Sequence, residues 1–258
     1  MGIYSNAYSR YKVQTQGLLD FAVFVAYAVP LLRDEIASIK TGTVATLHRP
    51  DFFYKSNRST PDDLLRVEPV YESRLSSYLL VSAFSFFEAF VVGVVEEVIS
   101  FHGGEKDFLS RSRTRTRQFM APHPPDIAAL KKKLRGVEAA NQRDKYRKFS
   151  RLLFDEGYRF PGELFATFGI KTLISKVKNL KAFEIPEILS DALQLELTAA
   201  ETRSLERTRT TRNQIAHGVQ LTLTMPETVK MTTDLRKLAT KIAEHVSENL
   251  LLVERYAP

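Results

Sequence analysis

The chain has 258 residues, of which 44% are hydrophobic, and this is enough for one large domain with a sizeable core. It contains no cysteine, which excludes disulfides, thiolate zinc sites, iron–sulfur clusters and cysteine nucleophiles. The formal net charge is +7, and no apolar signal segment follows the first residues. We therefore expect a cytoplasmic protein whose partner is anionic.

The first apolar stretch runs from Leu18 to Leu32 and is interrupted only by Asp20. It is shorter than the roughly 20 residues that a bilayer span requires, and it contains Pro30. We predict a buried helix that kinks or ends near Pro30, and no membrane anchor. Residues 41–69 are rich in Thr, Pro, Asp, Ser and Arg and predict an irregular arm.

The strongest helical pattern spans residues 75–101, where apolar side chains recur at helical spacing on most faces. Such a helix belongs in the centre of a bundle or at a subunit interface. Glu88 lies at its middle, and this carboxylate favours a protein core over a bilayer. The helix is predicted to end at His102, because two glycines follow it.

A basic segment occupies residues 103–151, where fourteen Lys and Arg side chains oppose five acidic ones. Asp126 is positioned to cap a helix that enters its lysine run. We interpret the segment as a basic insertion that binds a phosphate backbone. The candidate RNA-binding residues are Arg111, Arg113, Arg115, Arg117, Lys131, Lys132 and Lys133. The alternative is a solvated loop without a ligand.

The last third of the chain predicts helices over 163–180 and 186–197, followed by a helix that a capping box at Thr198 and Glu201 begins. Gly218 is expected to end that helix, and Pro226 to open a final one. Strand-like alternation is brief, over 219–224 only. The predicted fold class is all-α: a single helical domain, 1–258, with extra helices and the basic insertion. Glycine-rich phosphate loops and metal-ligand spacings are absent, so no cofactor and no metal is predicted.

The most informative motif is Arg-Asn-Gln-Ile-Ala-His-Gly at residues 212–218. Asn213 and His217 are four residues apart and share a helix face, with Arg212 about a quarter turn away. Arginine is a permanently charged phosphate ligand, and histidine transfers protons near neutral pH. Arg212, Asn213 and His217 are therefore the candidate catalytic residues, and Arg209, one turn before Asn213, would extend the phosphate surface.

Arg212 falls on an apolar stripe of its helix, so it should be half-buried and in need of a carboxylate. Glu88, which lies on an apolar helix face, is the predicted partner. The pair belongs either to an active site or to a purely structural ion pair. The alternative for His217 is a structural histidine at a helix C-terminus, stabilised there by the helix dipole.

The Arg-Asn-x-x-x-His motif with its trailing glycine, at the end of a helix late in an all-helical chain, resembles the HEPN superfamily. The residues of the motif are very similar to those of the bacterial RNase members, including the RiboL-PSP-HEPN group. The likeness covers residues 76–100 and 187–218. The resemblance implies a helical bundle that dimerises with two motifs facing each other, and frequently a metal-independent endoribonuclease. Toxin members controlled by a nucleotidyltransferase carry a tyrosine where this chain has Val219, so that regulation is not expected here.

The chemistry of RNA agrees with these side chains, because the 2′-hydroxyl is an internal nucleophile that needs only a base, an acid and a cation over the phosphate. One motif contains one histidine, so a homodimer would supply both proton-transfer groups. We expect RNA as substrate, and an antitoxin or another defence-system protein as a further partner. The competing hypotheses are a non-catalytic RNA-binding or dimerisation module and a helical scaffold whose basic arm binds a membrane surface or an acidic partner.

Overall fold

The computed structural model describes residues 5–47, 60–108, 125–135, 143–155 and 180–251. Every regular element within those ranges is helical, in agreement with the predicted all-α class. The long helices are α1 (Asn6–Lys40), α3 (Tyr71–Phe101), α10 (Ala199–Ala216) and α11 (Met225–Asn249). Shorter helices are α2 (Pro61–Val67), which η1 (Glu68–Val70) continues, α5 (Pro125–Arg135) and α6 (Arg143–Asp155). Three short helical turns follow one another before α10: η3 (Ala182–Glu184), α9 (Ile185–Glu187) and η4 (Ile188–Ala192).

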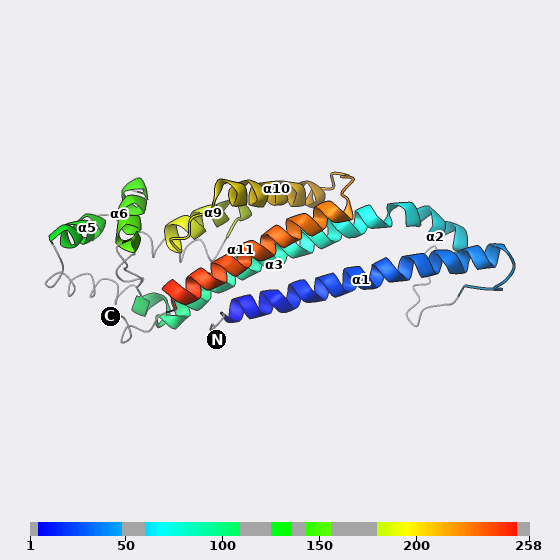
Figure 1. Cartoon of the computed structure of the whole chain (residues 1–258), viewed down its shortest axis with the longest axis horizontal. Helices are drawn as coiled ribbons and strands as arrows, with labels where there is room; N and C mark the ends of the chain where they lie inside the picture. The colour runs from blue at the N-terminus through cyan, green and yellow to red at the C-terminus, as the bar shows by residue number, and fades with distance from the viewer. Residues whose placement is uncertain (1–4, 48–59, 109–124, 136–142, 156–179, 252–258) are drawn as a thin grey trace.

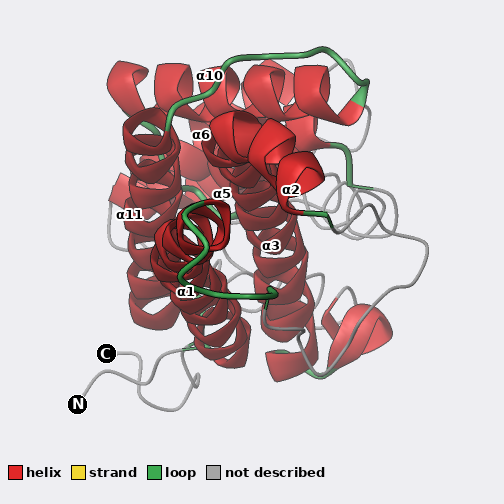
Figure 2. Ribbon diagram, turned by 90° about the vertical axis from the view of Figure 1, so that its right-hand side faces the viewer, coloured by secondary structure: helices red, strands yellow, loops and turns green. Residues whose placement is uncertain are grey.

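Helix α3 is the centre of the bundle, as its apolar circumference predicts. It packs against α1, α10 and α11, and α10 and α1 lie on opposite sides of it (Figures 1 and 2). Phe84, Phe87 and Phe90 of α3 are buried in the main core cluster. Tyr8 and Tyr11 of α1 contact this aromatic row, with Tyr11 and Phe90 ring centroids 5.2 Å apart.

The beginning of α1 is tied to α3 by capping contacts. The Glu97 carboxylate accepts hydrogen bonds from the backbone N–H groups of Asn6 and Ala7, at 2.9 and 3.1 Å. The Ser5 hydroxyl accepts a third from Tyr8 N–H. These contacts satisfy N–H groups that a helix leaves unpaired in its first turn, and they place a negative charge at the positive end of its dipole.

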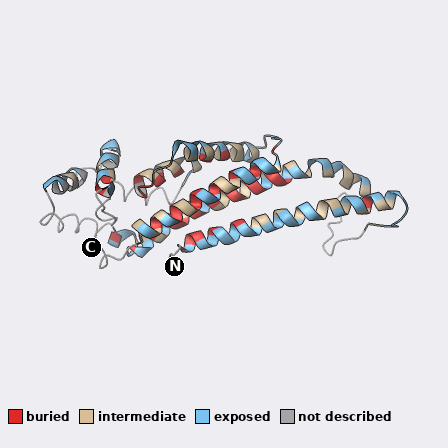
Figure 3. Cartoon of the chain, viewed as in Figure 1, coloured by how far each residue is buried: buried red, intermediate tan, exposed pale blue. Residues whose placement is uncertain are grey.

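The first apolar stretch was expected to form a buried helix that kinks or ends near Pro30, and the expected burial was wrong. Helix α1 also does not end at Pro30 but continues through it to Lys40. Between Gln16 and Glu35 it contains no buried residue, and its outer face is exposed (Figure 3). The exposure follows because α1 packs chiefly on α3, which covers one face of α1 and leaves the opposite one open.

Two helical stretches, Asn6–Lys40 and Pro61–Phe101, have the length and hydropathy of a membrane span. Their most apolar windows are 6% and 56% buried, respectively. Core helices of soluble proteins meet the same criterion, as the position of α3 in the bundle illustrates.

Two further boundaries differ from expectation. The predicted irregular arm is helical over α2 and η1, because Thr60 caps the first turn and Pro61 takes a position where its missing N–H costs nothing. The helix expected over 186–197 ends at Ala192. Within the basic segment, the helix expected to enter the lysine run from Asp126 is confirmed as α5, and it packs on α6. The helix predicted over 163–180 lies almost entirely outside the described residues.

Candidate functional site

Local sequence signals define where α10 begins and where it ends. The predicted capping box is present: the Thr198 hydroxyl accepts from Glu201 N–H, and the Glu201 carboxylate accepts from Thr198 N–H at 2.7 Å. At the other end His217 is the C-cap, and Gly218 adopts a left-handed φ of 80°. Gly218 N–H donates to Ile215 C=O and Val219 N–H to Gln214 C=O, which is the Schellman arrangement. The motif therefore lies at a defined helix terminus.

Arg212 is held in the interface between α10 and α3. Its Nη2 donates to Glu88 Oε2 at 3.1 Å, which is the ion pair that the sequence predicts. Its guanidinium lies over the buried ring of Phe84, 5.7 Å from the centroid. The side chains of Arg212 and Glu88 are 26% and 23% exposed, so the pair is half-buried rather than sealed.

Asn213 is oriented by its neighbour, since Arg212 Nη1 donates to Asn213 Oδ1 at 3.0 Å. The backbone carbonyl oxygen of Asn213 accepts a hydrogen bond from the backbone N–H of His217 at 2.9 Å. With Oδ1 engaged, the Nδ2 group of Asn213 keeps two donor hydrogens for another acceptor.

His217 differs from Arg212 and Asn213 because it is exposed, whereas they are partly buried. Within the part of the chain that the structure describes, its imidazole has no hydrogen-bond partner. Within one protomer, hydrogen bonds therefore join the side chains of Arg212, Asn213 and Glu88, whereas the His217 side chain makes none with the described residues. Glu88 and Phe84 hold the Arg212 guanidinium on the α3 side.

Electrostatics at the pair follow from its burial. Desolvation raises the pKa of the Glu88 carboxyl above its ordinary value, and the positive charge of Arg212 offsets part of that rise. Arg212 Nε is buried without a hydrogen-bond partner in the described structure. The guanidinium therefore has two N–H groups committed to Glu88 and Asn213, while the two remaining Nη hydrogens are available to an incoming anion.

Arg209 does not join this cluster. Its Nη2 pairs with Glu206 on the same helix, at 3.3 Å, and its side chain is 25% exposed. Arg207 pairs with Glu227 of α11 at 3.7 Å. Neither arginine contacts the motif, so a phosphate surface around them is not preassembled in one chain.

The predicted RNA-binding residues lie far from the motif or outside the described part. Arg111, Arg113, Arg115 and Arg117 are outside the described residues, and nothing is described of the Lys131 side chain. Lys132 and Lys133 are exposed on α5, where the Lys133 ammonium lies 5.5 Å from the Phe149 ring of α6. Figure 1 places α5 and α6 beyond the end at which α10 begins, whereas His217 lies at its other end.

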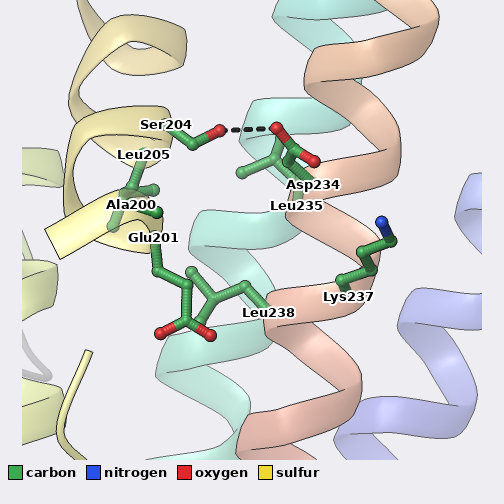
Figure 4. A pocket seen from close by; sticks show the side chains of 8 residues that line it. All are labelled: Ala200, Glu201, Ser204, Leu205, Asp234, Leu235, Lys237 and Leu238. Carbon is green, nitrogen blue, oxygen red and sulfur yellow. Dashed lines mark hydrogen bonds between the residues drawn. The ribbon is translucent and has the colours of Figure 1, made fainter. Parts of the chain in front are cut away.

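A cavity of about 200 Å³ opens between α10 and α11 (Figure 4). Its walls are apolar with a polar rim on which Ser204 Oγ donates to Asp234 Oδ2 at 2.7 Å. The lining residues are Ala200, Glu201, Ser204, Leu205, Asp234, Leu235, Lys237 and Leu238. None belongs to the motif, so this cavity is separate from the candidate site. The described residues also contain no group of three His, Asp or Glu side chains placed to share a metal ion.

Comparison with known proteins places this geometry in a family. Searches of curated proteins and of solved structures return no match to the chain. Among protein-family models, RiboL-PSP-HEPN matches residues 51–248, a range that contains α2, α3, α10 and nearly all of α11. Both Glu88 and the motif at 212–218 lie inside the match. The chain belongs to the RiboL-PSP-HEPN family of HEPN proteins.

Proposed function

We propose that this protein is a metal-independent endoribonuclease that cleaves RNA by attack of a 2′-hydroxyl on the adjacent phosphate. Membership of a HEPN family supports a nuclease or RNA-binding module. The observation that carries the finer proposal is an exposed His217 one helical turn after an anchored Arg212 and Asn213. The expected setting is a cytoplasmic toxin–antitoxin, phage-defence or stress response, with an antitoxin or defence protein as a further partner.

Arg212 and Asn213 would hold the scissile phosphate. Arg212 retains two Nη hydrogens beyond those given to Glu88 and Asn213, and Asn213 presents its Nδ2 donors. A guanidinium already fixed by an ion pair and an aromatic ring loses little conformational entropy on binding an anion. Glu88 acts in this scheme as a positioning residue, because it contacts Arg212 and not the RNA.

His217 would transfer the protons. In the reaction the 2′-oxygen forms a bond to phosphorus while the bond from phosphorus to the 5′-oxygen breaks. A base takes the proton of the 2′-hydroxyl, and an acid delivers one to the departing 5′-oxygen, leaving a 2′,3′-cyclic phosphate and a 5′-hydroxyl. One chain contributes one exposed histidine to the motif, so a two-fold pair with both motifs adjacent would provide the base and the acid.

The helices α5 and α6 would bind the RNA backbone at a distance from the cleavage site. Lys132, Lys133, Lys145 and Lys148 are exposed there and can neutralise phosphates without reading sequence. Their position at the opposite end of α10 from His217 would require an RNA that extends along the helix, or one that bridges two protomers.

The proposal is tested with the purified full chain and end-labelled RNA in EDTA, with analysis of the product ends. We expect cleavage to 2′,3′-cyclic phosphate ends, and its loss in His217→Ala and Arg212→Ala. Gln214→Ala is the matched control, since this exposed neighbour lies on the same helix and should retain activity. RNA with a 2′-O-methyl group at the cleavage site should resist. Cleavage that persists in a clean His217→Ala preparation would overturn the assignment.

One observation favours a second function, a non-catalytic RNA-binding module. Arg212 is already paired with Glu88, and the exposed lysines of α5 and α6 are remote from the motif. In that case wild-type protein binds RNA with a steep dependence on salt and leaves it intact, and charge-neutralising changes at Lys132 and Lys133 reduce that salt dependence. Binding without cleavage in the assay above would support this function.

A further inference from the structure

The outer face of α1 carries a continuous stripe of exposed residues. Val13, Phe24, Tyr27 and Leu31 are 69–74% exposed. Gly17 and Asp20 are exposed and occupy the intervening positions. The stripe residues are thus separated by alternating steps of four and three, the spacing of a helix that packs along another helix.

This stripe is unusual for a surface. Phe21 and Val23 flank it and are 56% and 55% exposed, so six large apolar side chains lie on one helix. With aromatic side chains contributing about 150–250 Å² each when fully exposed, the patch is on the order of 600 Å², more than most monomers leave open. No described residue of the chain covers it. The stripe is also about 27 Å long at ~1.5 Å per residue, enough for a helix–helix contact.

Gly17 is the second observation. A Cβ at this position would meet nothing within 4 Å, so packing in the single chain does not explain a glycine there. Gly93 of α3 is the contrast, because a Cβ there would lie 3.2 Å from Ala7 Cβ, where α1 and α3 approach closely. A glycine inside a helix costs about 1 kcal/mol relative to alanine, and a close approach by another helix would account for it.

We propose that the stripe from Val13 to Leu31 is a self-association surface, where α1 of a second copy of this chain packs antiparallel. The stripe positions are symmetric about residue 22. In a two-fold antiparallel pair Gly17 therefore lies level with Tyr27 of the other copy, Val13 with Leu31, and Asp20 with Phe24. The residue with no side chain thus meets the largest ring. The Tyr27 hydroxyl, one turn from Phe24, reaches toward Asp20 of the other copy.

Charge favours a second copy over a lipid surface. Asp20 lies within the stripe, and the next positions of the same spacing beyond its two ends are the exposed Asp34 and Arg10, which an antiparallel pair places level with each other. Helices that lie in a membrane interface usually carry basic residues that attract anionic lipids. Bilayer insertion would also bury the Asp20 carboxylate, which among the described residues accepts one hydrogen bond, from Gln16 at 2.7 Å.

This surface is separate from the candidate site. Helix α1 lies outside the family match at residues 51–248. It also lies on the opposite side of α3 from α10, so pairing through α1 would not bring two His217 side chains together (Figures 1 and 2). The inference is therefore independent of RNA cleavage, and an assembly through α1 can combine with a second two-fold contact at the motif.

Sedimentation equilibrium of the full chain tests the proposal over a range of concentrations. We expect Tyr27→Glu to halve the mass of the wild-type assembly and to leave the circular dichroism spectrum unchanged. Phe183→Glu is the control, because Phe183 is 58% exposed but lies in η3, and it should keep the wild-type mass. His217→Ala should also keep it. An identical mass for wild type and Tyr27→Glu would overturn the proposal.

Two further measurements identify the occupant. Gly17→Ala should keep or raise the thermal midpoint of dilute protein but weaken association at least tenfold. The chain has no native cysteine, so a mixture of Gly17→Cys and Tyr27→Cys chains should form an interchain disulfide that neither chain forms alone. Cross-linking of each variant alone, with none between them, would exclude the antiparallel register. Binding of a monomeric wild-type chain to phosphatidylcholine–phosphatidylglycerol vesicles would overturn the proposal in favour of lipid.

Discussion

Helices α1 and α3 are alike in length and hydropathy but differ in how far they are buried. Both are longer than thirty residues, and both are apolar enough to meet a membrane-span criterion. The most apolar window of the stretch containing α3 is 56% buried, against 6% for that of α1. The difference is one of neighbours: α3 is enclosed by α1, α10 and α11, whereas α1 packs chiefly on α3. An apolar helix face thus indicates that a partner is needed, but not whether the same chain supplies it.

The same contrast applies to the carboxylates of the two helices. Glu88 of α3 is half-buried and pairs with Arg212 of α10, whereas Asp20 of α1 is exposed and, among the described residues, accepts a hydrogen bond from Gln16. The fold accommodates an acid inside an apolar stretch when another helix brings a cation to it. On α1 the exposed Asp20 can remain solvated, so the single chain does not need to bring a cation to it.

The largest effect is expected from truncating a matched pair of phenylalanines. Phe87→Ala in α3 should cost about 3–5 kcal/mol of unfolding free energy, because a fully buried ring leaves a cavity. Phe24→Ala in α1 should change the stability of dilute protein by less than about 0.5 kcal/mol, because that ring is 70% exposed. Chemical denaturation measures both. Phe87→Leu offers a milder variant if Phe87→Ala fails to fold. Equal costs for the two alanine variants would remove the distinction between the helices.

A smaller effect is expected from the carboxylates. Glu88→Ala leaves the half-buried Arg212 guanidinium without its ion-pair partner, and we expect a loss of about 1–3 kcal/mol. Asp20→Ala should be close to neutral in dilute protein, since its exposed side chain contributes one surface hydrogen bond. Comparable losses in the two variants would contradict the assigned environments.

The pH dependence of stability should differ in sign between two acids. The pKa of Glu88 is raised in the folded state, so its protonated form is favoured there, and its contribution is lost as pH rises from below its ordinary pKa through the folded value. For Glu201 burial acts to raise the pKa, but hydrogen bonds from Lys241 and Thr198 outweigh it and the pKa is lowered. Its contribution is lost as pH falls. Denaturation of Glu88→Gln and Glu201→Gln against pH should therefore give opposite slopes relative to wild type.

The smallest effect is expected at Tyr11, where α1 enters the core. Its hydroxyl is buried without a hydrogen-bond partner among the described residues, and burial raises its pKa. Tyr11→Phe keeps the ring contacts with Phe87 and Phe90 and removes the unsatisfied hydroxyl. We expect a change between zero and about 1 kcal/mol toward greater stability. A thermal midpoint several degrees lower would imply a partner for this hydroxyl.

Much of the candidate site follows from local sequence. The capping box at Thr198, the left-handed Gly218 and the helical spacing between them define α10, because caps and glycine conformations are short-range properties. The Glu88–Arg212 contact was also predictable, since each residue is a charge on an apolar stripe and a buried charge requires an opposite one. The roles of Arg212, Asn213 and His217 in catalysis stay predictions.

By itself, the sequence determined the helical class, the ends of α10, the family motif and the need of Glu88 for a cation. Only the tertiary structure decided that α1 continues through Pro30, that its outer face is open, and that Arg212 packs against Phe84 as well as Glu88 of α3. These features depend on which helices lie beside one another, and periodicity reports a face without naming its neighbour. For both the candidate site and the α1 stripe, the proposals therefore invoke a second chain.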